Sequence, residues 1–436
     1  MLIRTTVTNL AILVVNFATG LLAARFLEAE GRGHYALVLL YPQLVCYLSL
    51  LGLDRSVPIA VGQKRLSRPL RSVLIAALAS SVLALVATAT CVWLLVEPPW
   101  LRTLGLLLCS YIPFFQVYTL FVTAHMGRGD FVSYNRSRGA FYFSYLMGLV
   151  LVTALGRASV STFVAAYAVS TILAAITSVA LFLRRSRELA SKAPDPGEGN
   201  AHDGHDIPTR ELLALGLPFV VPGVLYGFSA HIDRLVLSLW LDARALGIFV
   251  VYVSYVALIG PVANAVNAHV FQRSLSRTDH EDVGLMIRLA GAVYAVLLTL
   301  LGAVAPIFIE LLYGPTFATE LGVAYILLIS SFFLFSSQLL NEHLKGKRNT
   351  MQDVVSNLVY LATIAAGTAT LVGPLRLTGL AIAVSLANFA RYLVVATYFR
   401  KLVGVDLRHI VLPRGADLAV GWSLLTAVFH PRKRPN

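Results

Sequence analysis

Three ionisable side chains lie inside one apolar run, FSAHIDRLVLSLW at residues 228–240. His231, Arg234 and Ser238 are spaced by three and four residues, so a helix would present them on one face. A charge in the middle of a bilayer costs about 2.5–3.5 kcal/mol, and such side chains therefore face protein or water rather than lipid. A guanidinium group in this position is suited to binding a phosphate or pyrophosphate through paired hydrogen bonds.

An Asp-Arg pair occurs twice in apolar surroundings, as Asp54 and Arg55 in LGLDRSVP and as Asp233 and Arg234 in the run above. In each case the two charges could form a structural ion pair, or the arginine could extend its head group to the nearer membrane interface. The alternative is that the arginines line a water-filled cavity, with Asp54 and Asp233 as candidates for ion coupling. The sequence leaves these alternatives open.

Further polar residues recur at helical spacing within apolar runs. Arg391 follows Ser385 and Asn388 at intervals of three residues, and Asn16 and Asn264 belong to similar stripes. Such stripes fit faces that line a cavity, and they also fit ordinary hydrogen bonds between helices. The charges inside the runs are neutral to basic in balance, which favours an anionic ligand over organic cations. The candidate substrate-binding residues are Arg234, Arg55, Arg391, His231, Asn16 and Asn264.

The elements that position these residues are predicted to be membrane helices. Of the 436 residues, 57% are apolar and 13% are charged, whereas soluble domains contain about 25% charged residues. Apolar runs of about 20 residues, long enough to cross a bilayer, recur along the chain. We therefore expect an all-α polytopic membrane protein. Its spans are expected near 5–27, 34–62, 70–96, 100–125, 138–156, 159–183, 211–240, 245–270, 286–313, 320–343, 352–373 and 377–399.

The basic residues indicate the orientation. Most of the 35 lysines and arginines fall in alternate loops, which would all be cytoplasmic if the N-terminus is cytoplasmic. The opposite loops carry only Arg25, Arg32, Arg102, Arg157, Arg244 and Arg376. The net charge of +13 therefore reflects membrane topology and does not indicate a nucleic-acid partner.

The apolar runs divide into two sets of six. We expect an N-terminal six-helix half at 1–186, a cytoplasmic linker at 187–209, a C-terminal six-helix half at 210–403, and a cytoplasmic tail at 404–436 with an interfacial helix.

A short internal repeat supports this division. FLEAEGRGHYALV, which begins at Phe26, resembles WLDARALGIFVVY, which begins at Trp240, and Gly33 matches Gly247. Because six spans separate the two copies, the halves are expected to point the same way around a central cavity. They would then be related by an axis along the membrane normal.

The sequence lacks the signatures of an enzyme. It contains no G-x-x-x-x-G-K-[ST], G-x-S-x-G or H-E-x-x-H motif, and the loops predicted to lie outside are short. HDGHD at 202–206 is more typical of a solvated linker than of a metal site, since nothing nearby completes a ligand set. We therefore expect no catalytic residue, no metal and no cofactor, with coupling to Na⁺ or H⁺ left open.

Two segments resemble a known family. GLLAARFLEAEGRGHYALVLLYPQLVCYLSLLGLDRSVPIAV at 20–61 resembles the opening of bacterial polysaccharide and oligosaccharide-lipid flippases, and HIDRLVLSLWLDARALGIFVVYVSYV at 231–256 resembles the start of their second half. These flippases belong to the multidrug/oligosaccharidyl-lipid/polysaccharide (MOP) exporter superfamily. The resemblance implies a V-shaped cavity with alternating access, and a bacterial inner membrane location. It also implies an undecaprenyl-diphosphate-linked glycan as cargo, with its pyrophosphate held by Arg234 and Arg55.

The leading hypothesis is therefore a flippase that moves a lipid-linked oligosaccharide between leaflets for surface polysaccharide assembly. Its expected partners are that lipid-linked oligosaccharide, membrane lipid and other proteins of glycan assembly. One alternative is an ion-coupled multidrug or metabolite antiporter of the same architecture. Another is a membrane component of glycan assembly that does not transport.

Overall fold

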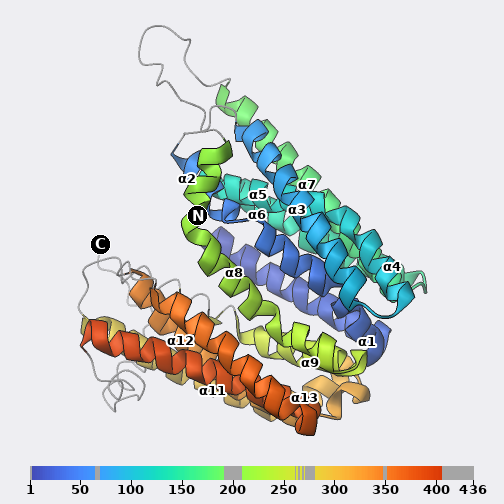
Figure 1. The fold of residues 1–436 in the computed structure, drawn as a ribbon, viewed down its shortest axis with the longest axis vertical. Helices are drawn as coiled ribbons and strands as arrows, with labels where there is room; N and C mark the ends of the chain where they lie inside the picture. The colour runs from blue at the N-terminus through green and yellow to red at the C-terminus, as the bar shows by residue number, and fades with distance from the viewer. Residues whose placement is uncertain are drawn as a thin grey trace, which may run out of the picture. The chain divides into compact units, whose positions relative to one another are not determined.

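The computed structural model describes residues 2–63, 69–190, 209–260, 280–346 and 351–404, together with 262, 263, 266, 267 and 270. The described part of the chain is almost entirely helical and contains no strand (Figure 1). The helices are α1 (Leu2–Ser49), α2 (Leu53–Gly62), α3 (Pro69–Leu95), α4 (Pro99–Leu108), α5 (Ile112–Gly127), α6 (Phe131–Ala154), α7 (Val160–Ala190), α8 (Thr209–Trp240), α9 (Ala243–Val256), α11 (His280–Tyr313), α12 (Leu321–Gly346) and α13 (Met351–Val403). The short 3₁₀ helices are η1 (Cys109–Tyr111), η2 (Ala257–Ile259) and η3 (Pro315–Ala318).

Within the described residues, 8 helices are long and apolar enough to cross a membrane, and most of the predicted spans lie on them. The span expected at 138–156 lies mostly on α6, which is not one of the 8, and the span expected at 245–270 lies partly outside the described residues. Two of the 8, Val7–Ser49 and Met351–Val403, each hold two predicted spans, and the backbone turns between these spans at Glu28 (φ 56°) and Arg376 (φ 49°). A positive φ costs a residue other than glycine about 1–3 kcal/mol, so packing of the flanking helices must hold each turn. The prediction of an all-α polytopic membrane protein is confirmed.

One predicted span differs from the structure. The span expected at 34–62 is not continuous, because Leu51 and Gly52 have φ angles of 48° and 77° and a separate helix, α2, follows them. The break lets the backbone of Gly52 pack directly on α8, where a Cβ atom on Gly52 would overlap the carbonyl oxygen of Gly216. Helical periodicity does not reveal this break, because it depends on a contact between segments far apart in the sequence.

The chain forms two compact units, and each is described by itself. The first unit consists of Met1–Ser254 and Leu312–Phe317, and the second of Tyr255–Leu311 and Ala318–Asn436. The two six-helix halves predicted from the apolar runs and the repeat have other boundaries than these two units. The division into halves therefore stays a prediction. The predicted linker and cytoplasmic tail lie almost wholly outside the described residues.

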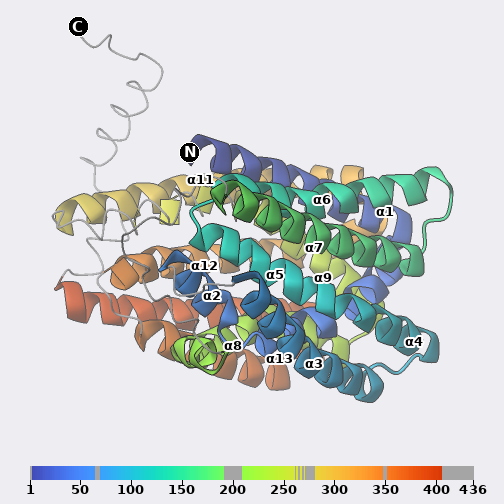
Figure 2. The same cartoon turned by 90° about the horizontal axis from the view of Figure 1, so that it is seen from above.

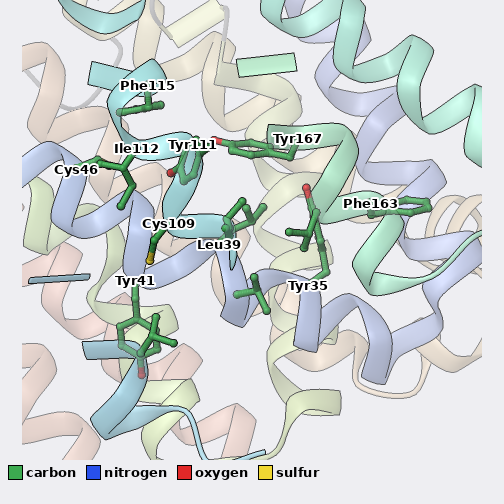
Figure 3. Packing of buried hydrophobic residues seen from close by; sticks show 14 of the residues in the cluster. Tyr35, Leu39, Tyr41, Cys46, Cys109, Tyr111, Ile112, Phe115, Phe163 and Tyr167 are labelled. Carbon is green, nitrogen blue, oxygen red and sulfur yellow. The ribbon is translucent and has the colours of Figure 1, made fainter. Parts of the chain in front are cut away.

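The core of the first unit is rich in tyrosine. Figure 3 shows Tyr35, Tyr111 and Tyr167 among its buried side chains. The rings of Tyr111 and Tyr167 meet edge to face at 5.7 Å, and Gln43 Nε2 donates a hydrogen bond to Tyr167 Oη at 3.2 Å. The hydroxyl groups of Tyr35 and Tyr145 hydrogen-bond to each other. These bonds satisfy buried phenol groups and join α1, α6 and α7, of which α6 and α7 run side by side (Figure 2).

The core of the second unit is built from α11, α12 and α13. The rings of Tyr294 and Phe335 stack at 4.0 Å, and Phe399 is buried in the same cluster. A cleft with about 310 Å³ of open space lies among these three helices, and Ser336 and Tyr392 provide its polar lining.

The two copies of the sequence repeat contact each other within the first unit. A Cβ atom on Gly33 would overlap the carbonyl oxygen of Ala243, and a Cβ atom on Gly247 would overlap the carbonyl oxygen of Ala29. Ala29 and Ala243 are also matched in the repeat, so the contact is reciprocal. The absence of a side chain on both glycines lets the start of α9 approach the middle of α1 at backbone distance.

Asp130 caps the N-terminus of α6. Its Oδ1 accepts a hydrogen bond from the backbone N of Ser133 at 3.1 Å, and its Oδ2 lies 4.0 Å from Arg185 Nε. Burial raises the pKa of Asp130, but hydrogen bonds from Ser133 outweigh this effect, and the pKa lies below the ordinary value of 3.8.

Replacing Asp130 with alanine is expected to lower the free energy of unfolding by about 1 kcal/mol at neutral pH, because the cap is lost. A carboxylate with a depressed pKa stabilises the fold above its ordinary pKa and stops doing so as the pH falls through the depressed value. The difference in melting temperature between wild type and Asp130→Ala should therefore shrink below pH 3.8. A constant difference across the pH range would contradict this account.

Candidate functional site

The charged face of α8 lies inside the first unit. His231 is buried, and its ring stacks on that of Tyr47 from α1 at 6.3 Å with an interplanar angle of 30°. Asp233 and Arg234 are half-buried, and Asp233 Oδ1 accepts a hydrogen bond from the backbone N of Arg234 at 2.8 Å. Among the ion pairs of the described residues, none joins the Arg234 guanidinium group to Asp233. The N–H donors of this guanidinium group are therefore not used by Asp233, and another acceptor could bind them.

A second arginine, Arg32 of α1, lies near Arg234. The two guanidinium groups are close enough to repel each other, and the Nε atom of each is buried without a hydrogen-bond partner in the described chain. Arg32 also lies over the ring of Tyr35, with Cζ 5.4 Å from the ring centroid. The phenol groups of Tyr145 and Tyr313 also lie near Arg32. Two like charges thus lie close enough to interact in a largely buried place.

The charge balance of this pair is basic. Asp233 interacts electrostatically with Arg234, and Arg32 adds a second positive charge beside them. The guanidinium fork matches the geometry of phosphate and carboxylate oxygens. Arg32 and Arg234 together are therefore suited to holding an anion, and we call them the arginine pair.

Sequence reasoning missed Arg32. Its position between two apolar runs predicts an outside loop, and two of the tyrosines around it, Tyr145 and Tyr313, are distant in the sequence. One signal was present, since Arg32 precedes Gly33 within the internal repeat.

Asp54 and Arg55 form an ion pair in the first turn of α2. Arg55 Nε lies 3.6 Å from Asp54 Oδ2, and the two side chains are 65% and 38% exposed, respectively. The pair lies near the phenol group of Tyr47, which also stacks on His231. Tyr47 thus connects this ion pair to the charged face of α8.

The two predicted asparagines contribute less to this picture. Asn16 is exposed on α1, and its backbone oxygen accepts a hydrogen bond from Thr19 Oγ1 at 2.8 Å. Asn264 lies outside the described residues.

Arg391 belongs to the second unit, where it lies in a polar network. Its Nη2 donates to Asn357 Oδ1 at 2.9 Å, and its guanidinium carbon lies 4.0 Å from the ring centroid of Tyr360. Asn357 Nδ2 in turn donates to the backbone oxygen of Asp353 at 2.7 Å. Arg391 therefore has structural partners in α13, and its predicted role in binding substrate stays a prediction.

Asp353 connects α12 to α13 in this network. Its Oδ1 accepts from Asn341 Nδ2 at 2.8 Å, and its Oδ2 lies 3.4 Å from Lys345 Nζ. We expect Asp353→Ala to lower the free energy of unfolding by about 1–3 kcal/mol, since it leaves partly buried donors unsatisfied. Thermal melting of the purified protein measures this change. Glu188→Ala, which removes the exposed ion pairs with Arg184 and Arg185 on α7, is the control and should melt like wild type.

Comparisons with known proteins give the fold. No family model and no curated protein sequence matches the chain. A MATE-family multidrug resistance transporter of the MOP superfamily in an inward-facing conformation has a TM-score of 0.70 at 14% identity, covering 92% of this chain and 98% of that one. The lipid II flippase MurJ in an inward closed conformation has a TM-score of 0.72 at 13% identity, covering 100% and 94%. A MOP superfamily transporter from Pyrococcus furiosus has a TM-score of 0.64 at 13% identity, covering 92% and 94%.

These likenesses extend over nearly the whole chain, and at such identities they concern the fold alone. With its apolar helices, the chain is a multi-pass membrane protein, and its helical fold is that of the MATE-family transporter and of MurJ.

Proposed function

We propose that this protein is a flippase that moves an undecaprenyl-diphosphate-linked oligosaccharide across a bacterial inner membrane for surface polysaccharide assembly. The charged head group crosses through the protein by alternating access while the polyprenyl tail stays in lipid. The fold supports a transporter, and one protein with this fold is a lipid II flippase.

The arginine pair is the observation that carries the proposal. Arg32 and Arg234 repel each other inside a membrane protein, and each has a buried Nε atom that no group of the described chain hydrogen-bonds. An isolated charge in such a place is costly, so a bound anion would stabilise both side chains. A pyrophosphate presents several oxygens to two guanidinium forks and matches this need. At another stage of transport, Arg55 is proposed to leave its ion pair with Asp54 and to bind the pyrophosphate instead.

An ion-coupled multidrug antiporter is the main rival, because other proteins with this fold are multidrug resistance transporters. An organic cation would require an excess of acidic groups, whereas the arginine pair is basic. For the transporter from Pyrococcus furiosus, a reversed polarity of the binding pocket suggests a different function. The sign of the charge in the pocket is thus a reasonable criterion within this fold, and here it favours an anion.

Deleting the gene tests the function directly. We expect a lipid-linked glycan precursor to accumulate in the cytoplasmic leaflet, where a lectin too large to cross the membrane would reach it in inverted vesicles and not in right-side-out vesicles. Expression of the wild-type chain should restore the normal distribution. An unchanged precursor distribution, together with new sensitivity to cationic drugs, would instead identify an antiporter.

A further inference from the structure

Four tyrosines of the first unit lie near one another on four different helices. They are Tyr47 of α1, Tyr118 of α5, Tyr142 of α6 and Tyr226 of α8, and we call them the tyrosine face. The phenol groups of Tyr142 and Tyr226 lie near that of Tyr47, and the phenol group of Tyr118 lies near that of Tyr142. Ring contacts connect two of the four, since the ring centroid of Phe141 lies 6.0 Å from that of Tyr118 and 5.1 Å from that of Tyr142.

Two members of the tyrosine face, Tyr47 and Tyr226, are largely exposed. Tyr47 contacts the rings of Phe115 at 5.9 Å and His231 at 6.3 Å, yet 52% of its surface is exposed. Tyr226 is 70% exposed. Both rings therefore present area that the described residues leave uncovered.

A membrane-interface belt does not explain these two residues. Interfacial tyrosines lie near the ends of spans, at the level of the lipid head groups. Tyr226 lies about midway along the apolar helix Arg210–Trp240. Tyr47 lies near the end of α1, but its ring stacks on His231 of that same apolar helix. At this depth a phenol hydroxyl needs a polar partner, which protein, water or a ligand must supply.

The surroundings of the tyrosine face offer hydrogen bonds and little free charge. Asp54, which lies near Tyr47, is already paired with Arg55. Arg138 lies near Tyr118, and its Nη1 donates to Asn9 Oδ1 at 2.8 Å. A ligand for this face should therefore combine apolar C–H surfaces, which stack on rings, with hydroxyl groups, which exchange hydrogen bonds with phenols. A sugar ring has both properties.

The position of the tyrosine face relative to the arginine pair agrees with such a ligand. Tyr47 stacks on His231, and Arg234 follows His231 by three residues, about 4.5 Å along the helix. In a sugar pyrophosphate the first sugar is bonded directly to a phosphate oxygen. A sugar pyrophosphate whose phosphate groups are bound by the arginine pair would therefore place its first sugars near Tyr47.

We infer that Tyr47, Tyr118, Tyr142 and Tyr226 form a carbohydrate-binding face for the sugars nearest the pyrophosphate. This inference rests on the proposed function and names the part of the site that contacts the glycan. The arginine pair holds the charge common to all such lipids, and the tyrosine face contacts the part that differs between them. Selectivity among glycans therefore depends on the tyrosines rather than on the arginines.

Two kinds of probe test the arginine pair and the tyrosine face separately in the purified full-length protein. Geranyl diphosphate carries the anion without sugar, and maltose, cellobiose and N,N′-diacetylchitobiose carry sugars without phosphate. Saturation-transfer NMR should detect at least one of these disaccharides with wild type, through the protons on its ring carbons. Binding of that disaccharide should weaken at least tenfold in Tyr47→Leu and Tyr226→Leu. Geranyl diphosphate should bind these variants like wild type.

Conservative and matched variants complete the experiment. Tyr226→Phe keeps the ring and loses the hydroxyl, so it should retain part of the sugar signal if stacking contributes. Tyr325→Leu removes a tyrosine of the second unit that is 40% exposed, and it should leave sugar binding unchanged. Equal melting temperatures exclude misfolding as the cause of any loss.

Three results would overturn the inference. One is the absence of a signal from all three disaccharides with wild type, and another is a signal that both leucine variants retain. The third is binding of tetraphenylphosphonium, an aromatic cation, that depends on the tyrosines while sugar binding does not. If sugar binds as expected but geranyl diphosphate does not, the arginine pair and the proposed function fail while the tyrosine face stands.

Discussion

Cells that carry Arg234→Ala are expected to lose at least about 90% of glycan translocation, and Arg32→Ala should have an effect of similar size. A hydrogen bond to a charged group contributes about 1.5–3 kcal/mol, which corresponds to about a 10- to 150-fold change in binding. Each variant removes one of the two guanidinium groups that hold the anion. Surface glycan and the inner-leaflet precursor, measured together, report the loss.

One lysine variant and one variant of an exposed arginine provide the controls. Arg234→Lys keeps the charge but loses the paired hydrogen bonds, so translocation should recover only in part. Arg244→Ala removes an exposed arginine in the first turn of α9 and should leave translocation unchanged. Normal glycan levels in both Arg32→Ala and Arg234→Ala would remove the arginine pair from the mechanism.

Gly33→Val is expected to disrupt the packing of the first unit more than any other single substitution considered. Its Cβ would overlap the backbone oxygen of Ala243, and a backbone atom cannot rotate aside as a side chain can. Overpacking of a closed interface costs about 1–3 kcal/mol, and a clash with backbone lies at or above the upper end of that range. We expect a clear loss of thermal stability in detergent, and Gly247→Val should reproduce it.

Two other glycines are matched controls for this prediction. A Cβ atom on Gly20 of α1 or on Gly223 of α8 would meet no atom within 4 Å. Gly20→Val and Gly223→Val should therefore change the melting temperature little. If Gly33→Val melted like these controls, the contact between α1 and α9 would not be as close as described.

The sequence predicts the helical elements well, because a long apolar run in a membrane protein has few alternatives to a helix. The turn at Glu28 and the turn at Arg376 fall between predicted spans, where polar residues interrupt the apolar runs. The break at Gly52 was not predicted, although Gly52 is followed by the polar residues Asp54 and Arg55 and by Pro58. It depends on Gly216, which lies in another part of the sequence.

The site was predicted less completely than the fold. Helical spacing groups His231 with Arg234, and the structure joins this face to Tyr47. Spacing cannot identify a partner on another helix, which is why Arg32 was assigned to a loop. Asn357 and Arg391 both belong to α13, but they lie on opposite sides of the turn at Arg376, so helical spacing could not reveal their contact.

The reciprocal contact of Gly33 and Gly247 bears on how the chain arose. If an ancestral protein consisted of one half only, two copies of it would have met at this point through identical surfaces, as in an isologous dimer. A mutation there would have changed both sides of the interface at once. After gene duplication and fusion, each side became free to vary alone, but a bulky residue on either side still pushes the other away. The two glycines are thus expected to persist or disappear together among descendants of such a fusion.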